Sequence, residues 1–247
     1  MIKIINKTTI ILLALFLLIS SPQIQASELT VENFVTLRTQ IHSEYQALLD
    51  SAPKRQLKKI KRSVRDKKIR LSANQRKFKS KYFKLLAEKK QLDAIFKLKE
   101  DFIKLYNDQK KNSSDLVKID REATEIAIGL FGEIPRLKKR FKSFFIPIVH
   151  NMFISVGVKK RGACKDWAED LLTYLRTLDR KYFYVTWGEA NPKKFTEHNV
   201  AVVYPATGDF HDGLIIDPWR TSGKPFWVHV KKDKHYKWNP WDYYGVY

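Results

Sequence analysis

The chain contains one cysteine in 247 residues, Cys164, within the segment RGACKDWAED at residues 161–170. Apolar residues recur at three- and four-residue steps from Trp167 to Leu178, which predicts an amphipathic helix with the cysteine in its first turn. Unpaired backbone N–H groups and the positive end of the helix dipole gather at such a turn, and both stabilise a thiolate. The neighbouring basic residues favour the thiolate, whereas Asp166, Glu169 and Asp170 oppose it. The segment therefore allows a nucleophilic thiol, and a buried cysteine acting as a small apolar residue is the alternative.

Two further residues complete a possible catalytic set. Cysteine catalysis needs a base within hydrogen-bonding reach of the sulfur and a third group that fixes the imidazole tautomer. His198 begins the predicted strand EHNVAVVY, and Asp217 ends the next predicted strand in GLIIDPW. Adjacent antiparallel strands can place these two side chains together, with the start of the helix across from them. We predict Cys164 as nucleophile, His198 as base and Asp217 as the group that orients the imidazole.

These three motifs, in order and in approximate spacing, resemble those of the transglutaminase-like superfamily, which includes bacterial cysteine proteinases. The resemblance covers about residues 157–220 and rests on Gly162-x-Cys164 with Ala168, on Glu197-His198-x-Val200-x-Val202, and on Leu214-Ile215-Ile216-Asp217-Pro218. It implies a papain-like core with the triad Cys164, His198 and Asp217, and a protease that acts on a protein or peptide substrate. A transglutaminase or amidase is the alternative enzyme.

The resemblance assigns no side chain to the oxyanion hole. The backbone N–H of Cys164 can supply part of that hole, and Trp187 and Asn151 are candidates for the rest. His211 with Asp212 is a rival pair to His198 and Asp217, but it lies in a turn-like GDFHDG segment. His150, beside Asn151 in an apolar run, is expected in the core, and His229 is expected to be exposed on a strand. Six scattered histidines and one cysteine do not form a cluster of metal ligands, so we expect no metal and no cofactor.

The order of the expected helices and strands predicts an α+β fold. Its N-terminal half is helical, and a catalytic helix packs on an antiparallel sheet in the other half. Helices are expected at 29–49, in two pieces within 54–111 with a break near 71–74, and from 116 to a stop at Gly129, Gly132 and Pro135. Strands are expected at 182–187, 197–204, 213–219 and 226–230. The aromatic tail at 235–247 is expected to pack over the sheet or to line a substrate groove.

The first 26 residues predict an export signal. Lys3 and Lys7 precede an apolar run at 10–19, and a small residue, Ala26, follows at a suitable cleavage position. The run is shorter than the ~20 residues that span a bilayer, so cleavage is favoured over an uncleaved anchor. We therefore expect a periplasmic or secreted protein divided into a signal peptide at 1–26, a basic helical region at 27–132 and a cysteine hydrolase domain at 133–247.

Positive charge is concentrated in the middle of the chain. Without residues 1–26 the chain has 45 basic residues (Lys and Arg) and 26 acidic residues (Asp and Glu). The segment Lys54–Lys111 alone contains 22 of the basic and 6 of the acidic residues. Such a segment suits an anionic membrane or cell-envelope surface, although solvated lysine-rich helix faces would have the same composition. Nucleic acid is the least expected partner, and nothing in the sequence indicates an oligomeric state. A non-catalytic envelope-binding protein is therefore the competing hypothesis to an enzyme.

Overall fold

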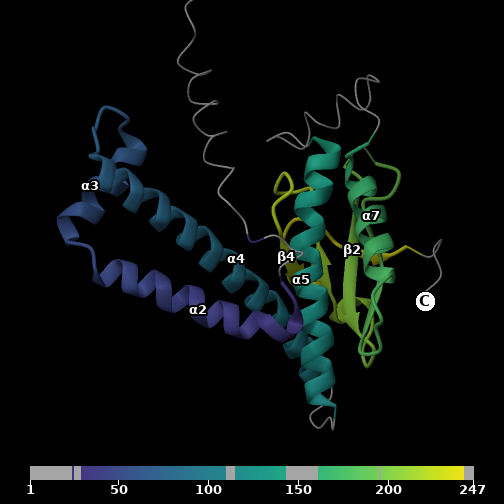
Figure 1. Ribbon diagram of the computed structural model, residues 1–247. Helices are drawn as coiled ribbons and strands as arrows, with labels where there is room; N and C mark the ends of the chain where they lie inside the picture. Colours follow the sequence, from purple (N-terminus) through teal and green to yellow (C-terminus); the bar gives the residue numbers. More distant parts are fainter. Residues whose placement is uncertain (1–23, 25–28, 110–114, 143–160, 195, 242–247) are drawn as a thin grey trace, which may run out of the picture. The chain divides into compact units, whose positions relative to one another are not determined.

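The structure is a computed structural model that describes residue 24 and residues 29–109, 115–142, 161–194 and 196–241 (Figure 1). The chain divides into two compact units after Ala94, within one long helix. The predicted signal peptide, apart from Ile24, lies outside the described residues, as do His150 and Asn151. Within the described ranges, no helix is long and apolar enough to cross a membrane.

The first unit is helical, as predicted. It holds α2 (Val31–Asp50), α3 (Lys54–Arg65) and the first part of α4 (Ala73–Gln109). Thr30 begins α2 because its hydroxyl accepts the N–H of Asn33 at 3.2 Å. Asp93 on α4 holds α2 through Arg38 at 3.1 Å and through Nε2 of His42 at 2.7 Å. The predicted break between two helices is confirmed, and it spans residues 66–72.

The second unit confirms the α+β class. It contains the rest of α4, then α5 (Leu116–Phe141), α7 (Cys164–Arg176) and a five-stranded antiparallel sheet in the order β4-β3-β2-β1-β5. The strands are β1 (Phe183–Ala190), β2 (His198–Pro205), β3 (Leu214–Ile216), β4 (Trp227–His229) and β5 (Asn239–Pro240). Short 3-10 turns, η2 (Phe210–Asp212) and η3 (Val230–Lys232), connect the later strands.

Helix α5 runs past its predicted end. We expected it to stop at Gly129, Gly132 and Pro135, but it continues to Phe141. Its apolar stripe also continues, because Ile134, Leu137 and Phe141 are all buried. Burial of that stripe outweighs the local cost of glycine and proline in a helix interior, about 1 and 3 kcal/mol. Gly129 also has a packing role, because a Cβ there would lie 2.1 Å from the Tyr174 hydroxyl of α7.

A buried carboxylate on α5 fixes where β1 begins. The two oxygens of Glu122 accept the backbone N–H groups of Lys181, Tyr182 and Phe183 at 2.8–3.0 Å. We expected this strand to end at Trp187, but it runs on to Ala190. Gly188 permits that extension, because a Cβ at this position would lie 2.9 Å from Val202 on β2.

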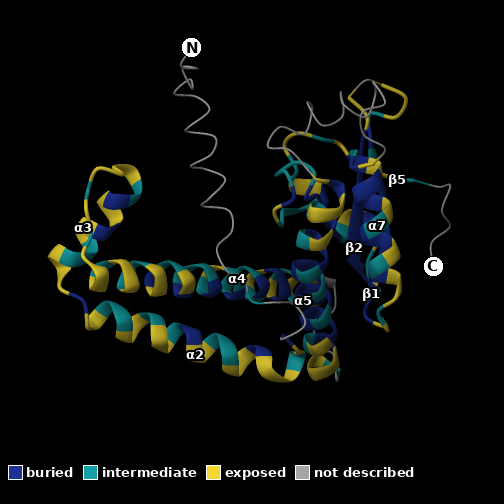
Figure 2. Ribbon diagram, turned by 45° about the horizontal axis from the view of Figure 1, so that its top comes forward, coloured by how far each residue is buried: buried dark blue, intermediate teal, exposed yellow. Residues whose placement is uncertain are grey.

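Strand β2 is buried along its whole length (Figure 2). On one face, Val200 and Val202 join a cluster completed by Ala190, Phe210, Ile215, Val230 and Trp238. Helix α7 packs against β2 and β1 as well. Because β2 pairs with β1 on one edge and β3 on the other, its first residue, His198, lies inside the protein.

Candidate active site

Cys164 is the first residue of α7 and so lies in the first turn of a helix, as the sequence predicts. The turn before it depends on Gly162, whose φ of 120° strains any residue with a Cβ. One carboxylate oxygen of Asp166 accepts the N–H groups of Gly162 at 2.7 Å and Ala163 at 2.9 Å. The first backbone bond of the helix runs from Trp167 N–H to the Ala163 carbonyl, so the N–H of Cys164 has no acceptor within the helix. The sulfur therefore lies at a helix start, beside a backbone N–H that no carbonyl of the helix accepts.

The charged neighbours of the thiol largely pair with one another. Arg161 contacts Asp166 at 3.3 Å, Glu169 at 2.7 Å and Asp170 at 3.1 Å. Asp170 also pairs with Arg140 from α5. Asp166, Glu169 and Asp170 are the carboxylates whose negative charge would destabilise a thiolate at Cys164. Their ion pairs with arginines reduce that destabilisation.

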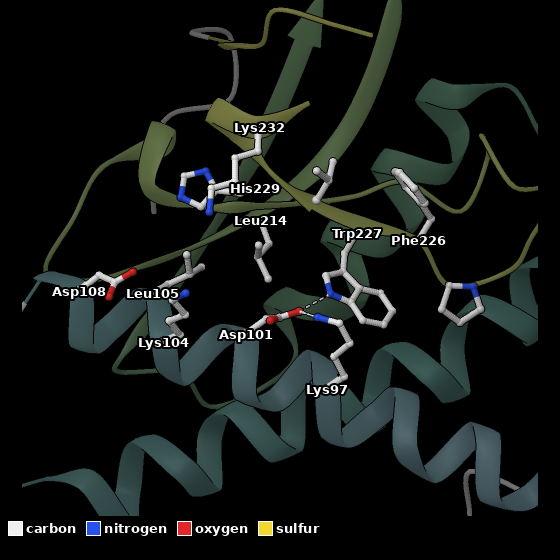
Figure 3. A pocket seen from close by; sticks show the side chains of 12 residues that line it. Lys97, Asp101, Lys104, Leu105, Asp108, Leu214, Phe226, Trp227, His229 and Lys232 are labelled. Atoms are coloured by element: carbon white, nitrogen blue, oxygen red, sulfur yellow. Dashed lines mark hydrogen bonds and ion pairs between the residues drawn. The ribbon is translucent and has the colours of Figure 1, made fainter. Parts of the chain in front are cut away.

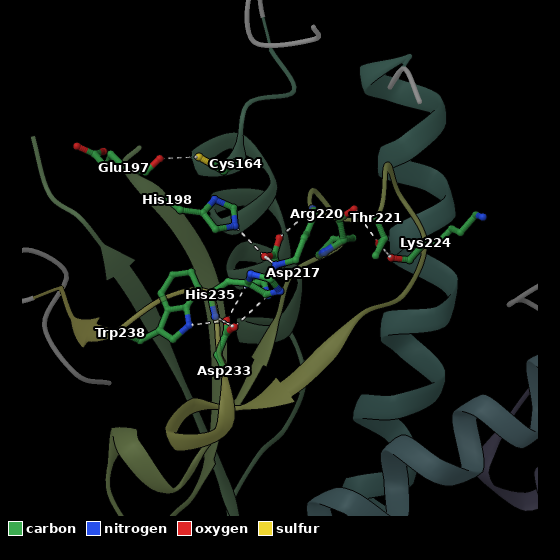
Figure 4. A network of polar contacts seen from close by, with 11 residues as sticks. Cys164, Glu197, His198, Asp217, Arg220, Thr221, Lys224, Asp233, His235 and Trp238 are labelled. Atoms are coloured by element: carbon green, nitrogen blue, oxygen red, sulfur yellow. Dashed lines mark hydrogen bonds and ion pairs between the residues drawn. The ribbon is translucent and has the colours of Figure 1, made fainter. Parts of the chain in front are cut away.

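His198 is held between the thiol and a carboxylate (Figure 4). Its side chain is 1% exposed, and Nε2 lies 2.7 Å from Oδ2 of Asp217. A carboxylate accepts the Nε2 proton, so the neutral ring carries its lone pair on Nδ1. Nδ1 is buried and has no aligned hydrogen-bond partner among the described residues, while the Cys164 thiol donates to the Glu197 carbonyl across 4.0 Å. The free ring nitrogen is therefore the one that can exchange a proton with Cys164.

The surroundings of His198 favour the imidazolium. Burial alone would lower the pKa of His198, but the hydrogen bond to Asp217, the nearby Cys164 sulfur and the negative charges of both raise it to about 9. A protonated imidazole and an ionised thiol stabilise each other in such an arrangement.

Asp217 follows β3 directly, where Pro218 ends the strand. Its side chain is 1% exposed and accepts from Arg220 twice, from Nε at 2.9 Å and from the backbone N–H at 3.2 Å. The Nε group of Arg220 shares Oδ2 with His198, whereas the backbone N–H of Arg220 bonds to Oδ1. These bonds fix the rotamer of Asp217, so that Oδ2 faces the imidazole.

A second buried carboxylate, Asp233, holds Arg220 in turn. The terminal nitrogens of Arg220 donate to Asp233 at 2.8 and 3.2 Å, and the indole N–H of Trp238 donates to the same carboxylate at 2.9 Å. Burial alone would raise the pKa of Asp233, but the hydrogen bonds from Arg220, His235 N–H and Trp238 lower it to about 2. Arg220 is thus a positioning residue between two carboxylates.

Aromatic rings surround the imidazole. The ring centroids of Trp219, Tyr236 and Trp238 lie 4.8, 4.9 and 5.5 Å from that of His198. Tyr236 and Trp238 come from the aromatic tail, and Trp241 packs on Trp187 at 4.9 Å. The tail up to Trp241 therefore packs on the site and the sheet, and residues 242–247 lie outside the described range. Sequence analysis missed Arg220, Asp233 and the ring contacts.

Loss of Arg220 should destabilise the second unit. The change Arg220→Gln leaves Asp233 buried without its cation and removes one of the two cationic partners of Asp217, and breaking a buried pair typically costs about 3–5 kcal/mol. Chemical denaturation at pH 7 checks this value. Because the pKa of Asp233 is depressed, its stabilising contribution is present above the ordinary carboxylate pKa and is lost as the pH falls toward 2. The gap in unfolding free energy between wild type and variant should therefore narrow below about pH 4, and a gap that stays constant would contradict the assignment.

Of the candidate donors to the oxyanion hole, the structure leaves the Cys164 backbone N–H in place and engages Trp187 elsewhere. The indole N–H of Trp187 donates to Oδ1 of Asn199 at 2.7 Å and is therefore already engaged. Asn151 lies outside the described residues. The backbone N–H of Cys164 is the donor that the described site offers to a developing oxyanion.

The rival histidine pair is not assembled. His211 is exposed on η2, and its Nδ1 lies 3.7 Å from Asp209. Asp212 pairs with Lys231 at 2.8 Å. These side chains stand apart from Cys164, which contacts the segment that leads into β2.

The expectation that His229 is exposed is wrong. It is half-buried and lines a cavity of about 510 Å³ between α4 and β4, together with Trp227 and Lys104 (Figure 3). Burial, and then the charges of Lys232 and Lys231, lower the pKa of His229. Trp227 donates to Asp101 at 2.8 Å across this cavity. None of the predicted triad residues lines it.

The described part of the chain offers no metal site. Among the described residues, no three His, Cys, Asp or Glu side chains are grouped so as to hold a metal ion. Comparison of the chain with protein-family models, curated proteins and solved structures finds no match. The resemblance to the transglutaminase-like superfamily therefore stays a prediction that rests on the three motifs.

Proposed function

We propose that the chain is an exported cysteine hydrolase that cleaves an amide bond of a peptide or protein through an acyl-enzyme on Cys164. The observation that carries the proposal is the buried imidazole of His198, bonded to Asp217 through Nε2 at 2.7 Å and facing the thiol through its other nitrogen. A cysteine with only a packing role does not require a histidine beside it that is oriented by a buried carboxylate.

The arrangement supports two successive acyl transfers. Nδ1 of His198 takes the thiol proton, and the Cys164 sulfur attacks the substrate carbonyl carbon to form a tetrahedral oxyanion near the Cys164 N–H. Collapse of this intermediate breaks the C–N bond, and the imidazolium returns its proton to the leaving amine. The product that remains on the enzyme is a thioester.

Deacylation reverses these roles. Water gives a proton to Nδ1 and attacks the thioester carbonyl, after which the sulfur leaves, regains the proton and releases a carboxylic acid. A primary amine in place of water would give a new amide, so the same residues support a transferase as the alternative enzyme. The acceptor that reaches the thioester decides between the two reactions.

Covalent labelling tests the proposal. A peptide carrying a thiol-directed electrophile, such as a vinyl sulfone, should modify folded protein once, at Cys164, as read by intact mass and peptide mapping. The rate should fall at least about 100-fold in His198→Ala, because the base is lost, and should be unchanged in the matched variant His211→Ala. A thiol that reacts only after denaturation would instead favour the non-catalytic envelope-binding protein.

A further inference from the structure

Helix α3 presents a face that is entirely cationic. Seven of its twelve residues are Lys or Arg and none is acidic. At about 100° per residue these seven fall within an arc of roughly 160°. All seven are exposed: Lys54, Arg55, Lys58, Lys59, Lys61, Arg62 and Arg65. We call this arc the α3 face.

The opposite side of α3 is packed. Ile60 and Ser63 are buried there, and Leu57 and Val64 are half-buried. Lys79 of α4 donates to the Ser63 hydroxyl at 3.1 Å, which ties the two helices together. The apolar side is thus largely covered, whereas the seven cationic residues are exposed, and Figure 2 shows α3 with both buried and exposed positions.

Very little negative charge neutralises this region. Residues 54–84 contain 15 Lys and Arg and one acid, Asp66, a net charge of +14 (15 − 1). Throughout this fully described stretch, the sole ion pair is Lys84 with Glu88 at 3.8 Å. Asp66 accepts a backbone N–H from Lys68 and pairs with no cation. Lysine-rich faces that serve only solubility usually alternate with acids, as α4 does at Lys97 and Asp101.

We infer that the α3 face binds the surface of an anionic lipid bilayer. A bilayer presents a plane of negative headgroups, and a one-sided cationic helix face about 18 Å long can lie against that plane with all seven side chains in reach. The face carries no aromatic or large aliphatic side chain, so contact stays at headgroup level without insertion. Stacking on the bases of a single-stranded nucleic acid would require such rings, and the α3 face lacks them, whereas contact with nucleic-acid phosphates would not, so duplex DNA is included as a competitor in the test.

This binding is separate from the proposed hydrolase. The α3 face belongs to the unit that ends at Ala94, and Cys164, His198 and Asp217 belong to the other unit. A face that binds membranes would hold the enzyme at a bilayer surface. Membrane binding is measured by vesicle retention and the hydrolase by labelling of Cys164, so a negative result for one proposal does not contradict the other.

Vesicle co-sedimentation of the full chain tests the inference. Vesicles of phosphatidylglycerol and phosphatidylcholine in equal parts should retain the protein at low salt, and retention should fall at least tenfold between 20 and 300 mM NaCl. The change of Lys58, Lys59, Lys61 and Arg62 to Gln should weaken retention by roughly tenfold or more. Pure phosphatidylcholine vesicles measure any binding that comes from the apolar run at residues 10–19.

A matched variant tests whether membrane binding depends on the position of the positive charges or only on the total charge of the protein. The change of Lys139, Lys194, Lys234 and Lys237 to Gln removes the same charge from exposed positions outside the α3 face and should leave retention within about twofold. Equal weakening by both variants, retention that salt does not reduce, or binding to polyglutamate or duplex DNA without binding to vesicles would overturn the inference. Labelling of Cys164, followed in the same samples, should be unchanged in both variants.

Discussion

Replacing Cys164 with alanine should abolish hydrolysis of any peptide that the wild-type protein cleaves, with kcat/KM reduced by about 10⁴-fold or more. Loss of a nucleophile leaves only substrate binding and the oxyanion donor, which together give a small residual acceleration. Cys164→Ser should be similarly inactive, because the hydroxyl ionises far less readily than the thiol at the same helix start. Peptide cleavage followed by mass spectrometry, with the unfolding free energy measured in parallel, checks both variants.

A loss of activity is informative only if the Cys164 variants remain folded, so their unfolding free energy serves as a control. The sulfur is one atom beside the Glu197 carbonyl, so its removal should change stability by no more than about 1 kcal/mol. Glu197→Gln keeps that carbonyl and changes an exposed carboxylate that bonds the Lys193 N–H at 2.8 Å and the Asn199 amide at 3.2 Å but no triad residue, so it should retain activity within a few-fold. Wild-type turnover by Cys164→Ser would show that the nucleophile lies elsewhere.

The spacing of apolar residues along the sequence was sufficient to predict which helix and strands carry the three candidate catalytic residues. Apolar spacing after Cys164 predicted a helix with that residue in its first turn, and β-branched runs predicted the strands that deliver His198 and Asp217. The pairing of Ala201 with Ile216 then sets β2 beside β3, which brings the histidine and the aspartate to 2.7 Å. Periodicity of this kind is visible within a window of ten residues.

Tertiary contacts decided what the sequence could not predict. Arg220 and Asp233 look like surface charges in the sequence, and only the fold of the intervening chain brings them together at 2.8 Å inside the protein. The same is true of Tyr236 and Trp238, whose rings reach His198 from a tail with no helical or strand period. Helix α5 passes Gly129 and Pro135 because its buried stripe, and not local propensity, sets its length.

Replacing Asp217 with alanine should lower kcat/KM by roughly 10²–10⁴-fold, less than loss of the nucleophile, because Asp217 acts through the imidazole. Without its carboxylate, Nε2 of His198 loses the 2.7 Å bond that fixes the ring tautomer. Arg220 would also lose one of its two acceptors and keep Asp233. Steady-state kinetics on a peptide substrate measure the loss, and the exposed Asp209→Ala serves as the control that should retain activity within twofold.

The pH profile distinguishes this positioning role from simple damage to the fold. Asp217 and Cys164 raise the pKa of His198 to about 9 against burial, so the imidazolium persists through neutral pH and loses its proton as the pH rises through 9. Activity that depends on the imidazolium as proton donor should therefore fall on an alkaline limb near pH 9 in the wild type. In Asp217→Asn the neutral amide keeps an acceptor for Nε2 but removes the charge, so this limb should move toward the ordinary histidine pKa near 6.5. An unmoved limb in a folded, active Asp217→Asn protein would contradict the assignment of Asp217 as the group that controls the imidazole.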